Sequence, residues 1–154
     1  MTAVPVNVHA TAIVVREAGL LFIGPSGAGK SITAFNCMVA ARRSAAFAAL
    51  IADDQVFLSQ KDGALFATCP DTIAGLIEIR GSGIARLPHI PSAPIHLAVL
   101  LVERNSMERL PPEGEVFDIP GIGSLPQLRM VQEAQEPLAI IAAFYPDIGI
   151  PRTF

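Results

Sequence analysis

The stretch Gly24 to Ser31 reads GPSGAGKS and has the residue types and spacing of a phosphate-binding loop. In the pattern GxxxxGK[ST], the glycines let backbone N–H groups turn inward, and a following helix adds the positive end of its dipole. Lys30 would reach phosphate oxygens, and the Ser31 hydroxyl would bind Mg²⁺, which prefers oxygen ligands. An ordinary glycine-rich turn is the alternative. The stretch predicts a nucleotide-phosphate site formed by Gly24, Pro25, Ser26, Gly27, Ala28, Gly29, Lys30 and Ser31.

Two adjacent carboxylates, Asp53 and Asp54, follow the apolar run 46–52. A P-loop fold presents an acid to the metal or to the nucleophile from the end of such a strand. A carboxylate near a γ-phosphate can accept a proton from an attacking hydroxyl. Neighbouring residues on a strand point to opposite sides, so one of the two would face the phosphate while the other binds a backbone or basic group. The alternative is a pair of turn or helix-capping aspartates.

Glu78 and Arg80, in the stretch EIRGSGI, form a third group with chemical potential. Residues two apart share one face of an extended chain. On that face the carboxylate would serve Mg²⁺ and the guanidinium would hold phosphoryl oxygens, with the glycines permitting close backbone approach. The alternative for these two residues is a surface ion pair beside a turn.

The elements that must position these residues are mostly short apolar runs. In chain order the sequence predicts strands at 6–15, 20–23, 46–52, 56–59, 65–68, 95–102 and 138–144, a helix at 31–43 and a short strand at 116–119. The phosphate loop therefore joins a strand to a helix, and the segments 6–23 and 56–68 read as hairpins. The remainder of 103–136 is predicted to be loop, and glycines in 78–84 are expected to interrupt regular structure. The predicted fold is α/β, a mixed β-sheet with flanking helices.

Composition limits the class of protein. The length of 154 residues predicts a single domain over 1–154. A composition of 51% hydrophobic and 16% charged residues suits a sheet buried on both faces or a subunit that buries further surface in an oligomer. A net charge of −3 and few aromatic residues argue against nucleic acid as a partner. Cys37 and Cys69 have no metal-site spacing and read as buried apolar residues. Without a leader pattern or a membrane-length apolar run, we expect a cytoplasmic protein with no membrane partner.

The combination of GPSGAGKS, ADD at 52–54 and EIRGSGI at 78–84 resembles the catalytic domain of the bacterial HPr kinase/phosphorylase family. The resemblance covers 9–102 well and the remainder weakly, and Ser82 stands where the family signature EIRGLGI has leucine. It implies a P-loop fold of the HPr kinase and phosphoenolpyruvate carboxykinase type that uses ATP and Mg²⁺. It also implies transfer of a phosphoryl group to a serine of the phosphocarrier protein HPr and, in many members, its removal by phosphorolysis. The chain is similar to the shortened alphaproteobacterial versions, whose carrier belongs to a nitrogen-related phosphotransferase system.

The resemblance also implies roles for individual residues. Asp53 matches the catalytic base and Asp54 its neighbour, while Glu78 matches a magnesium-site glutamate that would act with Ser31. Arg80 matches the signature arginine. His9 lies where the family carries a histidine, although a structural histidine beside a strand is the alternative.

The weaker region departs from the family in two places. Arg109 is a candidate phosphate-handling arginine, but Glu108 replaces the expected aspartate. At 128–137 the sequence reads LRMVQEAQEP where the family has a basic loop, and only Arg129 is basic there. Because opposite charge steers phosphoryl donors and acidic partners, this loss argues against phosphorolysis and the usual mode of HPr docking.

Three functions remain open from the sequence. The leading one is an ATP- and Mg²⁺-dependent HPr serine kinase that regulates a phosphotransferase system. The others are a catalytically reduced ATP-binding regulator of a sensor kinase pathway and a small-molecule P-loop kinase. Longer relatives form hexamers through segments with no counterpart here, so a homo-oligomer also stays open.

Overall fold

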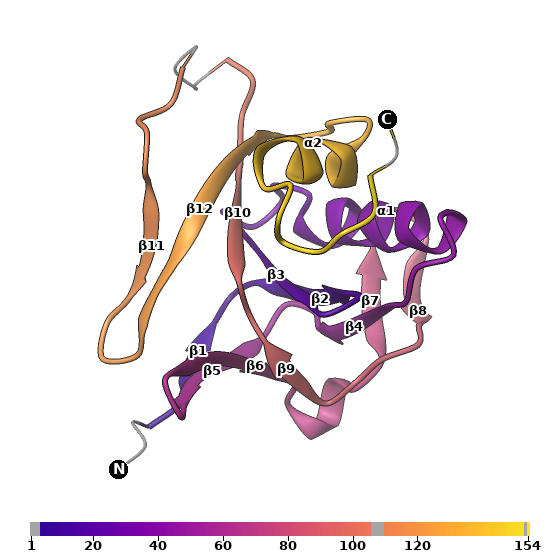
Figure 1. Ribbon diagram of the computed structural model, residues 1–154. Coiled ribbons are helices and arrows are strands. Elements are labelled where there is room, and N and C mark those ends of the chain that lie inside the picture. Colours follow the sequence, from indigo (N-terminus) through magenta and orange to yellow (C-terminus); the bar gives the residue numbers. More distant parts are fainter. Residues whose placement is uncertain (1–3, 106–109, 153) are drawn as a thin grey trace.

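The computed structural model describes residues 4–105, 110–152 and 154 (Figure 1). The elements in chain order are β1 (Val6–Val8), β2 (Thr11–Val15), β3 (Ala18–Ile23), α1 (Lys30–Arg43), β4 (Ala48–Ala52), β5 (Val56–Lys61), β6 (Ala64–Thr68), the 3₁₀ turn η1 (Asp71–Ile73), β7 (Leu76–Ile79), β8 (Gly83–Arg86), β9 (Ser92–Pro94), β10 (Leu97–Val102), β11 (Val116–Ile119), β12 (Gly123–Val131) and α2 (Pro137–Phe144). Helix α1 and the hairpins at 11–23 and 56–68 confirm the prediction from sequence.

Within the described residues, the central sheet has the strand order β11-β12-β10-β3-β2-β4. Strand β10 runs parallel to both β3 and β12, whereas β2 is antiparallel to β3 and β4. A smaller sheet has the order β1-β5-β6-β9, and β7 pairs with β8 alone. The predicted mixed sheet with flanking helices is therefore confirmed.

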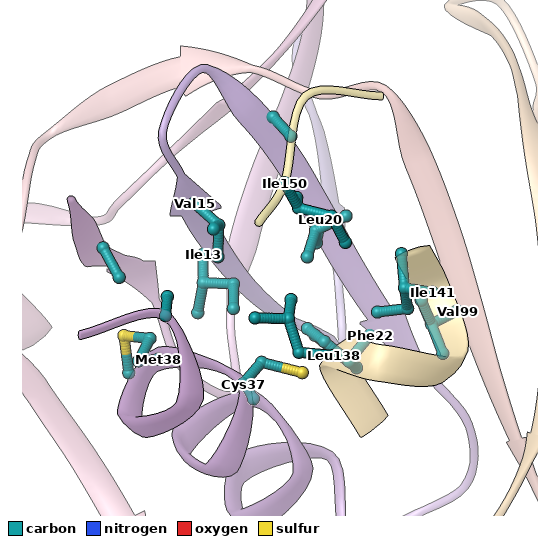
Figure 2. Packing of buried hydrophobic residues seen from close by; sticks show 14 of the residues in the cluster. Ile13, Val15, Leu20, Phe22, Cys37, Met38, Val99, Leu138, Ile141 and Ile150 are labelled. Carbon is teal, nitrogen blue, oxygen red and sulfur yellow. The ribbon is translucent and has the colours of Figure 1, made fainter. Parts of the chain in front are cut away.

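Two apolar clusters lie on opposite faces of the central sheet. On one face, side chains such as Ile13, Leu20 and Phe22 pack against α1 and α2 (Figure 2). On the other face, side chains such as Leu21 and Ile51 pack against the smaller sheet. Strands β2, β3 and β4 are buried along their whole length because both faces are covered. The expectation of a sheet buried on both faces is confirmed.

The prediction of one strand over 6–15 is wrong, because the chain changes sheets within it. Strand β1 pairs with β5 in the smaller sheet, and β2 pairs with β3 and β4 in the central sheet. His9 and Ala10 make the crossing between the two sheets. The segment 78–84 also differs from its prediction, since Gly81, with positive φ, lies in the turn of the β7–β8 hairpin and Gly83 is the first residue of β8.

Two further predictions fail in the last third of the chain. The apolar run 138–144 is not a strand but helix α2, in which Pro137 occupies the first turn and Leu138, Ile141 and Ala142 form a buried helical stripe. Within the predicted loop, 123–131 forms the long strand β12, which lies parallel to β10. Short apolar runs fit either a helix or a strand, and the partner of β12 is distant in sequence.

The cysteines are buried apolar residues, as the sequence predicts. Both cysteines are buried and unpaired, and burial raises the pKa of each thiol. Among the described residues, no helix combines the length and apolar character required to span a bilayer.

Candidate phosphate-binding and phosphoryl-transfer site

The predicted phosphate loop lies between the end of β3 at Ile23 and the start of α1 at Lys30. Gly24, Gly27 and Gly29 have φ values of 146°, 83° and 89°, which an L-residue rarely adopts. A side chain at Gly24 would also meet the backbone of Leu101 in β10. The loop therefore turns tightly into the N-terminus of helix α1, where backbone N–H groups can bind an anion.

Lys30 is almost completely buried at the base of this loop, with 7% of its surface exposed. Its Nζ donates hydrogen bonds to the carbonyl oxygens of Gly24 (2.9 Å) and Pro25 (3.0 Å). Burial lowers the pKa of Lys30, and the Asp54 and Asp53 carboxylates act in the opposite direction. Lys30 is thus held at the loop, where a bound anion would stabilise its buried charge.

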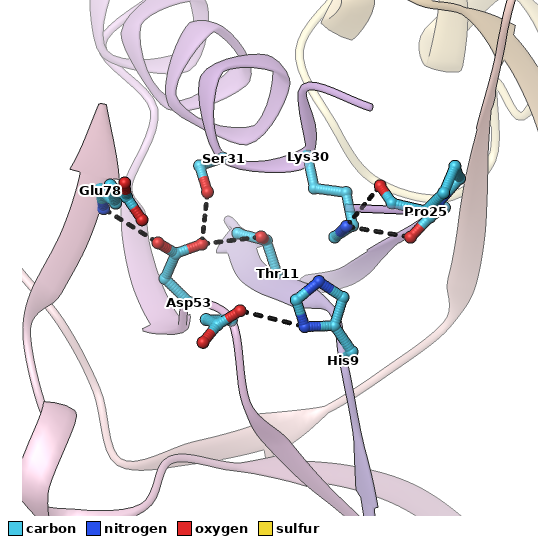
Figure 3. A network of polar contacts seen from close by, with 9 residues as sticks. His9, Thr11, Pro25, Lys30, Ser31, Asp53 and Glu78 are labelled. Atoms are coloured by element: carbon cyan, nitrogen blue, oxygen red, sulfur yellow. Dashed lines mark hydrogen bonds and ion pairs between the residues drawn. The ribbon is translucent and has the colours of Figure 1, made fainter. Parts of the chain in front are cut away.

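Asp53 connects several elements that are far apart in the sequence (Figure 3). Its side chain is 6% exposed, and its Oδ1 accepts hydrogen bonds from the hydroxyls of Thr11 (2.8 Å) and Ser31 (2.6 Å). Its Oδ2 accepts a hydrogen bond from the backbone N–H of Glu78 (2.9 Å). The register of β2 against β4 shifts at Ala12, directly beside Thr11. Asp53 therefore links β2, α1 and β7 through one buried carboxylate.

Asp54 has a different environment from its neighbour. It lies just beyond β4 with a φ of 74°, and its side chain is 64% exposed. Its Oδ1 is 3.0 Å from Nδ1 of His9, whose side chain is 50% exposed. The tight turn after β4 thus buries one carboxylate and presents the other to solvent with a histidine.

The β7–β8 hairpin brings Glu78 and Arg80 to the same region. A Cβ atom placed on Gly27 would lie 3.5 Å from Nη1 of Arg80, so the guanidinium lies over the phosphate loop. Glu78 and Arg80 do not form an ion pair with each other or with another described residue. The alternative interpretation of a surface ion pair is therefore wrong, and both charged groups face the pocket.

These groups line one pocket of about 310 Å³. Its lining comprises His9, Thr11, Ser26, Gly27, Ala28, Gly29, Lys30, Ser31, Ile32, Asp53, Asp54, Glu78, Arg80 and Glu133. Of the predicted site residues, Gly24 and Pro25 do not line it, although their carbonyl groups hold Lys30. Arg109 lies outside the described residues.

Three residues that line the pocket are not predicted from the sequence: Thr11, Ile32 and Glu133. Thr11 carries no motif, and only the pairing of β2 with β4 brings it to Asp53. Glu133 lies just beyond β12, a segment that the sequence predicts to be loop, and no sequence pattern marks its φ of 66°. Such a backbone conformation at a residue other than glycine is found more often at functional sites.

The donor set suits a magnesium ion bound together with phosphates. Across the part of the chain that the structure describes, no group of three or more His, Cys, Asp or Glu residues is arranged to hold a metal ion. Mg²⁺ typically takes one or two protein oxygens and completes its coordination with phosphate oxygens and water. The Ser31 hydroxyl and the Glu78 carboxylate, which both line the pocket, are oxygen ligands of this kind.

Known proteins resemble this chain in sequence and in fold. The family model described as HPr Serine kinase C-terminal domain matches residues 2–143. The HPr kinase/phosphorylase of Clostridium novyi is 37% identical over 82 residues, which are 53% of this chain and 25% of that relative. The HPr kinase/phosphorylase of Bacillus cytotoxicus is 42% identical over 78 residues, covering 50% of this chain and 23% of the relative. The match thus spans about a quarter of the length of these relatives.

One solved structure extends the similarity over nearly the whole chain. The Hpr(Ser) kinase/phosphatase from Coxiella burnetii superposes with a TM-score of 0.73 at 25% sequence identity. The superposition covers 92% of this chain and 94% of that one. The fold of nearly the whole chain is therefore shared with that protein.

Proposed function

The chain belongs to the HPr serine kinase C-terminal domain family, and on that premise we propose that it transfers the γ-phosphoryl group of ATP to a serine of the phosphocarrier protein HPr. One observation carries the proposal. The phosphate loop, the Asp53–Ser31 contact and the exposed Asp54–His9 pair all meet in a single pocket. This arrangement combines a phosphate cradle with a carboxylate that is open to an incoming hydroxyl.

The phosphate loop and two cations would bind the triphosphate. The loop amides and Lys30 would hold the phosphate oxygens. The guanidinium of Arg80, which lies over Gly27, would also bind them. Mg²⁺, held by Ser31 and Glu78, would supply neutralisation of the phosphate charge. The largest contribution of these residues to the rate would be positioning and charge stabilisation.

The geometry favours a supporting role for Asp53. A carboxylate has about four lone-pair sites, and hydrogen bonds from Thr11, Ser31 and the Glu78 amide already use three of those on Asp53. The carboxylate is also buried. We propose that Asp53 orients the Ser31 hydroxyl, the position that a P-loop protein assigns to the acid near its metal.

Asp54 is the better candidate for the proton acceptor. Its carboxylate is exposed to the pocket, and its one described partner is His9. A general base must reach the hydroxyl whose proton it accepts, and the open side of Asp54 permits this. The histidine would orient the carboxylate. The resemblance instead implies Asp53 as the base, and comparing Asp53→Asn with Asp54→Asn decides between the two assignments.

The charges around the pocket favour the forward direction of transfer. Arg129, the basic residue in the segment that replaces the family's basic loop, forms a bidentate ion pair with Glu115, with both contacts at 2.7 Å. The residue of this segment that lines the pocket is the acidic Glu133. Free phosphate would meet Lys30 and Arg80 there but also additional carboxylates. We therefore propose that phosphorolysis is slow relative to phosphorylation.

The test is phosphoryl transfer by the purified chain. Radiolabelled ATP, Mg²⁺ and purified HPr are incubated with the chain, and label is expected on an HPr serine. The variant Lys30→Ala is expected to lose transfer, which links the label to this site. ATP binding without transfer would instead support the regulator of a sensor kinase pathway. Label on a metabolite would support a small-molecule kinase, and absence of ATP binding would overturn the whole proposal.

A further inference from the structure

We propose that the outer face of the β7–β8 hairpin, defined by Glu78, Ile84 and Arg86, is the surface on which the protein substrate docks beside the phosphate pocket. This inference rests on the proposed function, because it requires a serine-bearing protein as the phosphoryl acceptor. It goes further by naming where that protein makes its apolar contact. The hairpin lies alongside α1, whose N-terminus follows the phosphate loop (Figure 1).

Strand register places Ile84 next to the site. In the antiparallel hairpin Glu78 lies directly opposite Ile84, and Leu76 lies opposite Arg86. Side chains of directly opposed residues share one face of a sheet, with Cβ atoms about 4.5–5.5 Å apart. Glu78 lines the pocket, and Ile84 is its direct cross-strand neighbour without lining the pocket itself.

The opposite face of the hairpin accounts for its attachment to the body of the protein. Ile77 is fully buried, and Ile79 and Ala85 pack against the core cluster beneath α1. The alternation of buried and exposed residues therefore fixes which face is free. Two apolar residues lie on that free face: Leu76 is half-buried, whereas Ile84 has 72% of its surface exposed.

A singly exposed isoleucine is common on protein surfaces and needs no explanation by itself. The position of Ile84 is what distinguishes it. It is the cross-strand neighbour of the pocket-lining Glu78, and a second exposed apolar side chain, Ile32 (41% exposed), lines the pocket itself. The other large exposed apolar residues among those described neither line this pocket nor pair with a residue that does: Val4, Phe47, Leu110, Val116, Phe144 and Phe154.

The chemistry of this face fits a folded protein better than a small molecule. A serine that enters the pocket on a protein brings a surrounding surface, which must cover the rim that includes Ile84. Protein interfaces combine an apolar centre with a polar rim and are enriched in arginine. Arg80 and Arg86 are exposed on the hairpin and form no ion pair with a described residue. The partner surface should therefore present apolar side chains flanked by acceptor or acidic groups.

The experiment measures steady-state phosphorylation of purified HPr by the full chain. Ile84→Asp is expected to raise the KM for HPr about tenfold or more, because a charge would replace an apolar contact. The kcat at saturating HPr and the affinity for ATP are expected to stay close to wild type. The neutral variant Ile84→Gln should raise the same KM several-fold, which guards against a folding defect in the aspartate variant. Val116→Asp is the matched control, since Val116 is a β-branched strand residue that is 59% exposed away from the pocket.

The outcomes separate this inference from the function on which it rests. If the wild-type chain phosphorylates HPr and Ile84→Asp leaves the KM for HPr unchanged, the docking surface is wrong while the proposed function stands. The same follows if Val116→Asp raises the KM equally. If the wild-type chain does not phosphorylate HPr at all, the proposed function fails and the docking inference fails with it.

Discussion

Replacing the two adjacent aspartates one at a time tests how the site divides its chemistry. Asp53→Asn and Asp54→Asn make the same chemical change at neighbouring positions and keep the size of the side chain. Asn is also tolerated in the positive-φ conformation that Asp54 adopts. Any difference between the two variants therefore reports on the environment of each carboxylate.

The structure predicts a clear difference in stability. An asparagine at position 53 has one acceptor oxygen and one donor NH₂ group, so it cannot accept from both the hydroxyls and the Glu78 amide as the carboxylate does. A buried donor left without a partner costs about 1–3 kcal/mol. Asp53→Asn should therefore lower the free energy of unfolding by about 1–3 kcal/mol. Asp54→Asn should change it by about 0–1 kcal/mol, because its contact with His9 is exposed.

The two variants should also differ in kcat and in the Mg²⁺ concentration that they require. Loss of a general base slows a reaction by about 10²- to 10⁴-fold, and we expect this loss in kcat for Asp54→Asn with an unchanged Mg²⁺ requirement. In Asp53→Asn the Ser31 hydroxyl is no longer oriented by a carboxylate, so the Mg²⁺ concentration for half-maximal activity should rise. Nucleotide binding should persist in both variants.

Urea unfolding, an Mg²⁺ titration of the transfer rate and binding of a fluorescent ATP analogue provide the measurements. The reasoning is refuted if Asp54→Asn keeps full activity while Asp53→Asn loses it with normal stability and a normal Mg²⁺ requirement. That result would make Asp53 the base, as the resemblance implies.

Three further predictions concern single residues. Burial lowers the pKa of Lys30 from 10.5, so the unfolded chain keeps this proton to a higher pH than the folded chain does. The free energy of unfolding of the wild type should therefore rise, relative to that of Lys30→Met, as the pH increases toward 10.5. Parallel pH profiles of the two proteins would contradict this. A Cβ atom at Gly19 would overlap the backbone carbonyl oxygen of Pro94. Gly19→Ala should therefore lower the free energy of unfolding, measured in urea, by about 1–3 kcal/mol. An unchanged urea midpoint would disprove the close approach of β3 and β9. The hydrogen bond from Arg129 lowers the pKa of Glu115 from 4.5. Glu115→Gln should therefore be slightly less stable than the wild type at neutral pH, and this difference should disappear as the pH falls through the lowered pKa. A difference that persists in acid would exclude the ion pair as its cause.

The parts of the fold that were predicted correctly depend on local signals. The phosphate loop, helix α1 and the hairpin at 56–68 are each encoded by a contiguous pattern of glycines, helix formers or alternating residues. The failures occur where a distant partner decides the outcome. Segment 138–144 becomes a helix because it packs against α1, and 123–131 becomes a strand because it pairs with β10.

The candidate site shows the same division. The sequence by itself predicted the glycine-rich loop and the helix that follows it, because the two form one continuous segment. It also determined the types of charged group available near that segment.

Only the tertiary structure decided which of those groups meet and what each can do. Asp53 contacts Thr11 across 42 positions and the Glu78 amide across 25, and the strand order that places β2 beside β4 makes the first contact possible. The turn after β4 then buries Asp53 and leaves Asp54 exposed beside His9. Two identical side chains thus acquire different chemistry, because the accessibility and hydrogen bonding of a carboxylate depend on its surroundings and not on its position in a motif.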